Sequence, residues 1–145
     1  MTHASGSEGR PPDPTDRVID ASALAFAVGG KSADAAALRS RMSQIRTHAP
    51  HLIDAEVGNV LRRHERVGLL ASVEAIDALR AARVLIDRRY AHGRALSEAA
   101  WALRHNLTFY DALYVALAVA LQIPLITADS RLGAAPSLPC DVELV

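Results

Sequence analysis

The chain has 145 residues, half of them hydrophobic, and its 16 basic and 16 acidic side chains give a formal net charge of zero. This length suffices for one domain with a sizeable core, and the balanced charge excludes a general electrostatic attraction to nucleic acid, so any nucleic-acid site must be local. The single cysteine, Cys140, excludes a disulfide framework and fits a reducing cytoplasm.

The N-terminal segment is small, polar and rich in proline, and it lacks the apolar region of a signal peptide. We expect residues 1–16 to form a disordered tail and residues 17–145 to form the domain. No stretch of ~18 consecutive apolar residues is present for a membrane span. The sequence therefore predicts a cytoplasmic protein.

The first half of the domain alternates strands and helices. Two β-branched residues before Asp20 predict a short strand that ends there. Ser32 is a typical N-cap, and apolar residues then recur at spacings of four and three, which predicts a helix over residues 33–47. A short apolar run after Pro50 predicts a second strand, followed by a helix over residues 53–67.

The second half continues this alternation. Gly68 is expected to end the preceding helix as its C′ residue, Ser72 to cap the next helix, and a strand to lie within residues 84–90. "GRALSEAAWALRHN" is helical, and residues 110–122 form a helix that is apolar on nearly every side and therefore buried. Strands in "PLITA" and "CDVELV" follow, so a parallel sheet covered on both faces is predicted.

Four carboxylates fall where this fold brings them to one edge of the sheet. Asp20 and Asp129 follow strands, Asp111 begins the buried helix, and Glu56 lies in the first turn of another helix. Ligands in open α/β sheets bind beyond the carboxyl ends of the strands. Each acid alone is explained as a helix cap or a first-turn anion. Their joint placement favours a site.

Four carboxylates close together repel one another, and some would take up protons unless a cation neutralises them. Hard oxygen ligands without histidine favour Mg²⁺ or Mn²⁺ over zinc. Such an ion lowers the pKa of a bound water and neutralises charge on phosphoryl oxygens. The chemistry that the four acids indicate is therefore hydrolysis of a phosphodiester bond.

The segments "VIDASAL", "EVGNVLRR", "YDALYVALA" and "LITADSRL", in this order, resemble the four acidic motifs of the PIN-domain ribonucleases. The resemblance is greatest to VapC-type toxins of type II toxin–antitoxin systems and covers residues 17–145. It implies a PIN-like three-layer α/β/α sandwich with a central, mostly five-stranded parallel sheet. It also implies Mg²⁺-dependent endonucleolytic cleavage of RNA (with Mn²⁺ as a substitute), inhibition of growth, a cognate antitoxin and a homodimer.

The resemblance also assigns site residues. The catalytic residues and metal ligands are Asp20, Glu56, Asp111 and Asp129. The supporting polar residues are Thr127, Asn59 and Ser22. The basic cluster after Glu56 is either a solvated helix face or a set of RNA phosphate contacts, and it comprises Arg62, Arg63 and Arg66.

The helices over residues 33–47 and 53–67 are expected to form a groove for an antitoxin segment, because not all of their apolar residues can face one small core. The residues expected in this groove are Leu38, Met42, Ile45, Val60 and Leu61. A basic side chain of the antitoxin would then occupy the acidic pocket in place of the metal.

Two other functions compete with this interpretation. "AFAVGGKS" nearly matches a phosphate-binding loop, although Ala25 stands at the first glycine position and the segment is apolar enough for a helix. A non-catalytic protein-interaction module is the other alternative. Among single residues, Trp101 and Tyr114 are expected in the core, and His48 and His51 at the surface.

Overall fold

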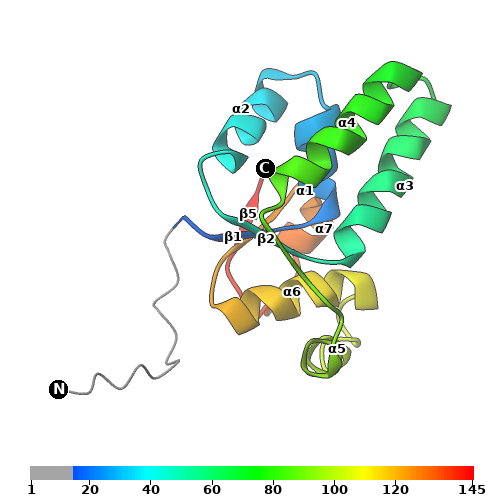
Figure 1. Ribbon diagram of the computed structural model, residues 1–145. Helices are drawn as coiled ribbons and strands as arrows, with labels where there is room; N and C mark the ends of the chain where they lie inside the picture. Colours follow the sequence, from blue (N-terminus) through cyan, green and yellow to red (C-terminus); the bar gives the residue numbers. More distant parts are fainter. Residues whose placement is uncertain (1–14) are drawn as a thin grey trace.

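The computed structural model describes residues 15–145, so the predicted tail lies outside the described part of the chain except for residues 15 and 16. Five strands form one sheet in the order β3-β2-β1-β4-β5, and every neighbouring pair is parallel (Figure 1). The strands are β1 (Arg17–Ile19), β2 (Thr47–Pro50), β3 (Arg88–Tyr90), β4 (Leu125–Thr127) and β5 (Val142–Leu144).

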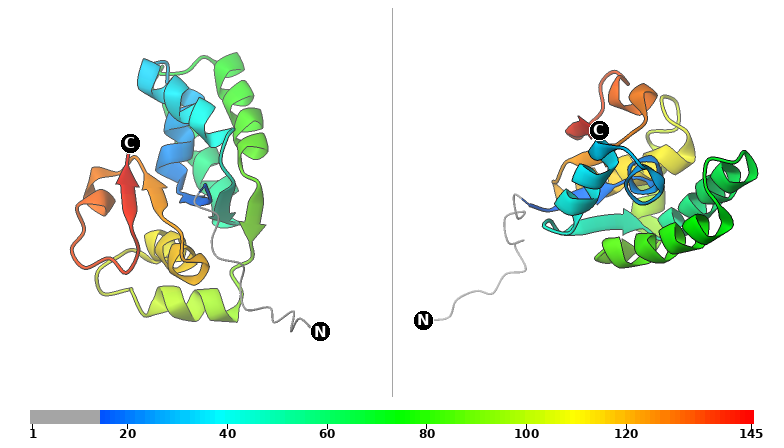
Figure 2. Two further views of the ribbon diagram at one scale, coloured as in Figure 1. Left: turned by 90° about the vertical axis from the view of Figure 1, so that its left-hand side faces the viewer. Right: turned by 90° about the horizontal axis from the view of Figure 1, so that it is seen from above.

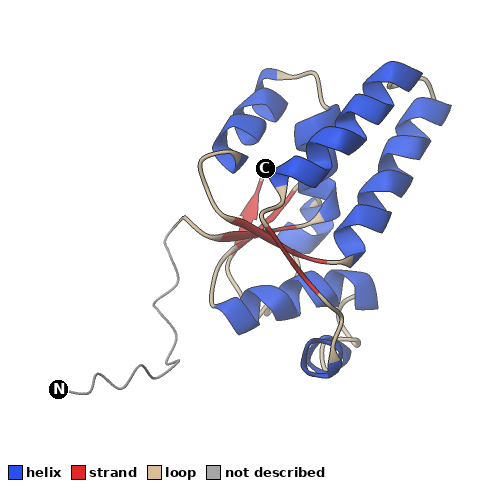
Figure 3. Cartoon of the chain, viewed as in Figure 1, coloured by secondary structure: helices blue, strands red, loops and turns tan. Residues whose placement is uncertain are grey.

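Helices cover both faces of this sheet. The helices are α1 (Ala21–Gly29), α2 (Ala33–Met42), α3 (Leu52–Arg66), α4 (Ser72–Leu85), α5 (Arg94–Trp101), α6 (Phe109–Leu121) and the short α7 (Ser130–Gly133). In Figure 1, α1 to α4 lie above the sheet, whereas α5 and α6 lie below it, and the side view in Figure 2 keeps the same order. Figure 3 shows the strands running between the two helical layers, which confirms the expected three-layer α/β/α sandwich.

Helix α6 forms the centre of the lower layer. Its residues from Ala112 to Ala118 are each at most 3% exposed, and the helix contacts β1, β2 and β4. A helix that is apolar on all sides is stable only where every side packs against protein. The prediction of a buried helix in this segment is therefore confirmed.

Two predicted boundaries near β2, the end of a helix and the position of a strand, are wrong. The helix expected over residues 33–47 ends at Met42, and the strand expected after Pro50 instead ends at Pro50. Thr47 begins β2 because it pairs with Arg17 of β1. Its backbone N–H also donates to Asp87 Oδ2 at 2.8 Å, next to the start of β3. Proline fits the end of the strand because it has no backbone N–H to donate to a sheet.

The turn between α3 and α4 follows the predicted glycine. Gly68 has a φ of +81°, in the left-handed region that favours glycine, and its place as the C′ residue is confirmed. Ser72, however, is the first helical residue and not the cap. The cap is Ala71, whose backbone N–H donates to Glu74 Oε1 at 2.9 Å.

The groove expected between the second and third helices is wrong for four of its five residues, whereas Val60, the fifth, is half-buried and lines a cavity beside Glu56. Leu38, Met42 and Leu61 are buried in the core, with at most 5% exposure, so they offer no surface to a partner. Ile45 packs against the same core. The core is larger than expected because α1, α2, α3 and α4 all pack together above the sheet.

The structure also tests the predicted burial of four single residues. Tyr114 is buried as expected, but Trp101 is 59% exposed at the end of α5. His48 is buried, with its Nδ1 2.8 Å from the Tyr90 hydroxyl and its Nε2 3.3 Å from Asp16 Oδ2, whereas His51 is exposed as expected. Asp16, the last residue of the predicted tail, thus contacts the folded domain.

In the segment that resembles a phosphate-binding loop, Ala25 to Gly29 form the end of helix α1, and only Gly30 to Ser32 lie between this helix and α2. A phosphate-binding loop must precede its helix so that free backbone N–H groups face the phosphate. The nucleotide-binding alternative is therefore wrong for this segment. Within residues 15–145, no helix is both long and apolar enough to cross a membrane.

Candidate active site

The four predicted carboxylates line one cavity at the sheet edge where β1 and β4 end. Asp20 follows β1 directly and Asp129 lies two residues after the end of β4. Helix α3 supplies Glu56 from its second turn, and α6 supplies Asp111 from its first turn. The cavity has a volume of about 250 Å³. Its wall also contains Tyr114, Arg63 and Arg131. The structure therefore brings together residues that more than a hundred positions of sequence separate.

Asp20 is the most buried of the four acids, with 6% exposure. Its Oδ1 accepts hydrogen bonds from the Ser22 hydroxyl at 2.7 Å and from the backbone N–H of Ala23 at 2.9 Å, so it also caps α1. Burial raises the pKa of Asp20, and the nearby charge of Asp111 adds to this rise. The helix-cap explanation and the site explanation thus both apply to this residue.

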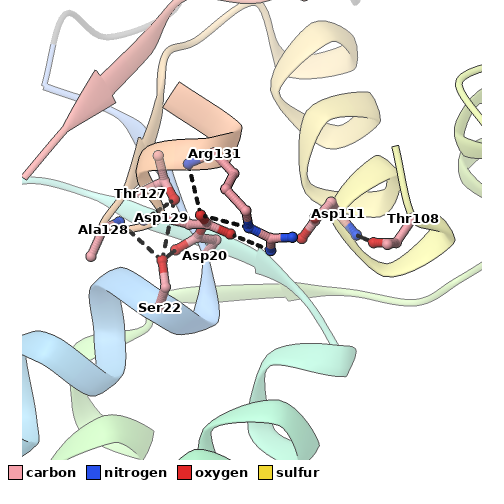
Figure 4. Close-up of polar contacts among 8 residues, drawn as sticks. All are labelled: Asp20, Ser22, Thr108, Asp111, Thr127, Ala128, Asp129 and Arg131. Carbon is pink, nitrogen blue, oxygen red and sulfur yellow. Dashed lines mark hydrogen bonds and ion pairs between the residues drawn. The ribbon is translucent and has the colours of Figure 1, made fainter. Parts of the chain in front are cut away.

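Two hydroxyl groups join the ends of β1 and β4 (Figure 4). The Ser22 hydroxyl accepts from the backbone N–H of Ala128 at 2.9 Å and lies 3.2 Å from the Thr127 hydroxyl. Thr127 is fully buried, and its hydroxyl accepts from the backbone N–H of Asp129 at 3.0 Å. Ser22 and Thr127, two of the three predicted supporting residues, therefore lie beside the acids and hold the backbone that positions Asp20 and Asp129.

Glu56 has a partner that the sequence did not reveal as a site residue. The Tyr114 hydroxyl donates to Glu56 Oε1 at 2.7 Å, from a ring that is 1% exposed. Burial raises the pKa of Glu56, although this hydrogen bond opposes the rise. Tyr114 lies three residues after Asp111, on the same side of α6. This spacing was the available signal for its role.

Asp111 lies in the first turn of α6, which Thr108 caps. Its backbone N–H donates to the Thr108 hydroxyl at 3.2 Å. A helix N-terminus favours an anion at this position. Burial nevertheless raises the pKa of Asp111, and the charge of Asp129 contributes to the rise. The charged form is therefore disfavoured despite its place at the helix start.

Asp129 differs from the other three acids because it has a cation beside it. Arg131 Nη2 lies 2.9 Å from Asp129 Oδ2, and the Arg131 backbone N–H donates to Oδ1 at 2.9 Å (Figure 4). The hydrogen bonds from Arg131 lower the pKa of Asp129. Asp129 also caps the short helix α7, as one alternative proposed. Arg131 is a second site residue that the sequence prediction missed.

The remaining predicted residues lie at different distances from the cavity. Arg63 lines it, whereas Arg62 lines a separate groove between α3 and α4. Arg66 is exposed at the end of α3. Asn59 is exposed one turn after Glu56 and is not part of the cavity wall. Only one residue of the predicted basic cluster therefore reaches the acidic site.

The donor chemistry of the site fits a hard divalent cation. Burial raises the pKa values of Asp20, Glu56 and Asp111 although Arg63 and Arg131 also line the cavity, so the chain's own cations do not fully offset the cost of burying these carboxylates. Carboxylate oxygens are the ligands that Mg²⁺ and Mn²⁺ prefer. As the side chains lie, however, no group of three His, Cys, Asp or Glu residues within 15–145 is placed to hold an ion. Asp129 would have to exchange Arg131 for the metal.

Comparison with known proteins identifies the family of the chain. Residues 17–138 match the PIN domain family. The chain is 53% identical over 128 residues to Ribonuclease VapC1 of Mycobacterium tuberculosis, covering 88% of this chain and 96% of that protein. The crystal structure of PAE2754 from Pyrobaculum aerophilum has a TM-score of 0.66 at 26% identity, covering 90% of this chain and 91% of that one.

A third likeness concerns the fold alone. The crystal structure of VapBC2 from Rickettsia felis, bound to a DNA fragment from its promoter, has a TM-score of 0.65 at 11% identity and covers 90% of this chain and 98% of that one. The fold, the placement of the acids and the extent of the sequence identity lead to one conclusion. The chain belongs to the PIN-domain family, and within that family it is of the VapC type.

Proposed function

We propose that this chain is a metal-dependent endoribonuclease, which cleaves cellular RNA as the toxin of a toxin–antitoxin pair. The observation that carries the proposal is the convergence of Asp20, Glu56, Asp111 and Asp129 on one cavity from four separate elements. The similarity to Ribonuclease VapC1 of Mycobacterium tuberculosis, which covers 88% of this chain and 96% of that protein, supports the same activity.

The carboxylates would hold Mg²⁺, or Mn²⁺ in its place. Asp20 and Asp111 are the strongest candidate ligands because burial raises their pKa values, and at Asp111 the charge of Arg131 offsets this rise only in part. Asp129 and Glu56 would complete the ion's coordination or orient the attacking water. A bound divalent ion supplies a nucleophilic hydroxide at neutral pH and neutralises charge on the phosphoryl oxygens.

The chain's own groups supply the remaining chemistry. Tyr114 keeps its proton, because burial and the charge of Glu56 raise its phenol pKa, and it therefore remains a hydrogen-bond donor to that carboxylate. Arg63 and Arg131 in the cavity wall are suited to hold RNA phosphates beside the acids. RNA would otherwise be repelled by a negative pocket.

The toxin role includes inhibition of growth until a cognate antitoxin binds, in the cytoplasm where the RNA lies. The likeness to VapC ribonucleases supports an antitoxin partner. A homodimer remains a prediction. The alternative, a non-catalytic interaction module, would be favoured by full cellular activity of a chain that lacks Asp111's charge.

Cleavage of labelled RNA by the purified chain, with Mg²⁺, with Mn²⁺ and with EDTA, tests the proposal. Asp20→Asn, Asp111→Asn and Asp129→Asn should each lose activity by more than the ~10–100-fold that is typical for residues outside the metal's direct ligands. Their circular dichroism should match the wild type. Asp34→Asn, an exposed acid in the first turn of α2, is the matched control and should keep full activity.

Wild-type rates from the Asp111→Asn variant would refute the assigned site. A wild-type protein that cleaves no RNA with any divalent ion would refute the activity itself.

A further inference from the structure

Aromatic side chains gather at the surface where α5 ends and α6 begins. Trp101 and Tyr110 are 59% and 58% exposed, and Phe109 is 38% exposed. The rings of Trp101 and Phe109 meet edge to face, with centroids 6.5 Å apart. Large apolar side chains at a surface indicate a binding site when they are grouped. Together with Arg104, these residues are called the aromatic surface below.

Arg104 gives this surface a positive charge. Its guanidinium lies 4.7 Å from the centroid of the Trp101 ring, and its Nη1 donates to the Trp101 carbonyl at 2.9 Å. Between Ala99 and Tyr110 the sequence contains no acid, whereas it contains Arg104 and His105. Aromatic rings and guanidinium planes are the groups on which proteins stack unpaired bases, and a positive charge suits the phosphates between them.

The aromatic surface adjoins the acidic cavity. Tyr110 is the neighbour of Asp111, which lines the cavity, and both belong to the first turn of α6. Helices α5 and α6 pack against each other (Figure 1). The contact of the Trp101 ring with Phe109 holds Trp101 beside the start of α6. An RNA strand with one phosphate in the cavity therefore has nucleotides within reach of these rings.

We propose that the aromatic surface binds unpaired bases of the RNA next to the cleavage site. This inference rests on the proposed ribonuclease function. A second copy of the chain is a poorer occupant, because polar residues interrupt the surface, whereas obligate contacts between copies bury continuous apolar area. The exposed polar residues there are Arg104, His105, Asn106 and Thr108.

Trp101 is the only tryptophan, so its fluorescence reports directly on this surface. The full chain in EDTA is titrated with a short unstructured RNA and with an abasic RNA of the same length. The intact RNA should quench Trp101, and the abasic RNA should not. Stacking contributes ~1–3 kcal/mol per base, so Trp101→Leu should weaken RNA binding about tenfold, whereas Trp101→Phe should retain most of the affinity.

Further variants separate a stacking contact from a structural role. Arg104→Ala should also weaken binding, and Val84→Ala, an exposed apolar residue at the end of α4, should not. In the cleavage assay with Mg²⁺, Trp101→Leu should raise KM and leave kcat close to the wild-type value.

The outcomes distinguish this inference from the function on which it rests. A wild-type chain that cleaves RNA, together with a Trp101→Leu variant that binds RNA equally well, would overturn the inference and leave the function standing. A wild-type chain that neither binds nor cleaves RNA would overturn both. If Trp101→Leu converts a dimer to a monomer and RNA does not change the fluorescence, the surface joins two copies and the inference is wrong.

Discussion

Arg131 Nη2 lies 2.9 Å from Asp129 Oδ2, so a cation from the chain itself partners one of the four acids at the site. The Arg131 side chain is 83% exposed, and its bond to Asp129 is therefore weak enough to exchange. This pair makes Arg131 a competitor of a metal ion for Asp129.

The first prediction concerns this competition. Arg131→Gln removes a positive charge from the cavity wall, so the affinity for Mg²⁺ should rise about three- to tenfold, as ~1 kcal/mol of Coulomb repulsion at such distances suggests. Calorimetric titration with Mg²⁺ measures the change. Arg94→Gln is the matched control, since Arg94 is about as exposed as Arg131 and forms an ion pair with Glu98 outside the cavity. Equal affinities of both variants would contradict the prediction.

The second prediction concerns stability without metal. Because burial raises the pKa of Asp111, the folded state disfavours its charge, and Asp111→Asn should melt above the wild type in EDTA at pH 7.5. In Mg²⁺ at ten times Kd, the wild type should gain about 1.4 kcal/mol, or roughly 3–6 °C, and the variant much less. A thermal-shift assay with four samples is sufficient.

The pH dependence of this difference follows from the sign of the pKa shift. A carboxyl with a raised pKa binds more protons in the folded state than in the unfolded state, so its stabilising effect is complete at low pH and is lost as pH rises from about 4 through the raised value. The melting difference between Asp111→Asn and wild type should therefore be small near pH 4 and grow with pH. A constant difference would show that Asp111 acts only as a helix-terminus anion.

The third prediction concerns the hydroxyl of Tyr114. Tyr114→Phe removes the side-chain hydroxyl that donates to Glu56, and this hydrogen bond lowers the pKa of Glu56, so the pKa of Glu56 should rise further. The acidic limb of the pH–rate profile should then move to higher pH, with near wild-type rates at alkaline pH. Tyr110→Phe, which removes an exposed hydroxyl beside Asp111, should leave the profile unchanged. A uniform loss of rate at every pH would instead indicate disordered packing.

The fourth prediction compares two glycines of the α3–α4 hairpin. Gly68→Ala should destabilise the fold by about 1 kcal/mol, because the φ of +81° is strained for any residue with a Cβ. Gly58→Ala should stabilise it by up to ~1 kcal/mol, since Gly58 lies inside α3 and a Cβ there meets no atom within 4 Å. Chemical denaturation measures both, and shifts of the same sign would refute the comparison.

Local patterns in the sequence were sufficient for most elements and for the four acids. The helix through Ala112–Ala118 and the turn at Gly68 follow from residue-to-residue periodicity and backbone preference, which depend on near neighbours. Asp20 and Asp129 could be placed together because parallel strands must end at the same edge of a sheet. None of these features depends on which distant residue a given side chain contacts.

Only the tertiary structure decided the features that depend on distant contacts. The start of β2 at Thr47 depends on pairing with Arg17 of β1, which lies 30 residues earlier, so no local pattern could predict it. Tyr114 meets Glu56 across 58 residues. The exposure of Trp101 depends on how α5 packs on α6, because an apolar residue on a helix is buried only if another element covers its face.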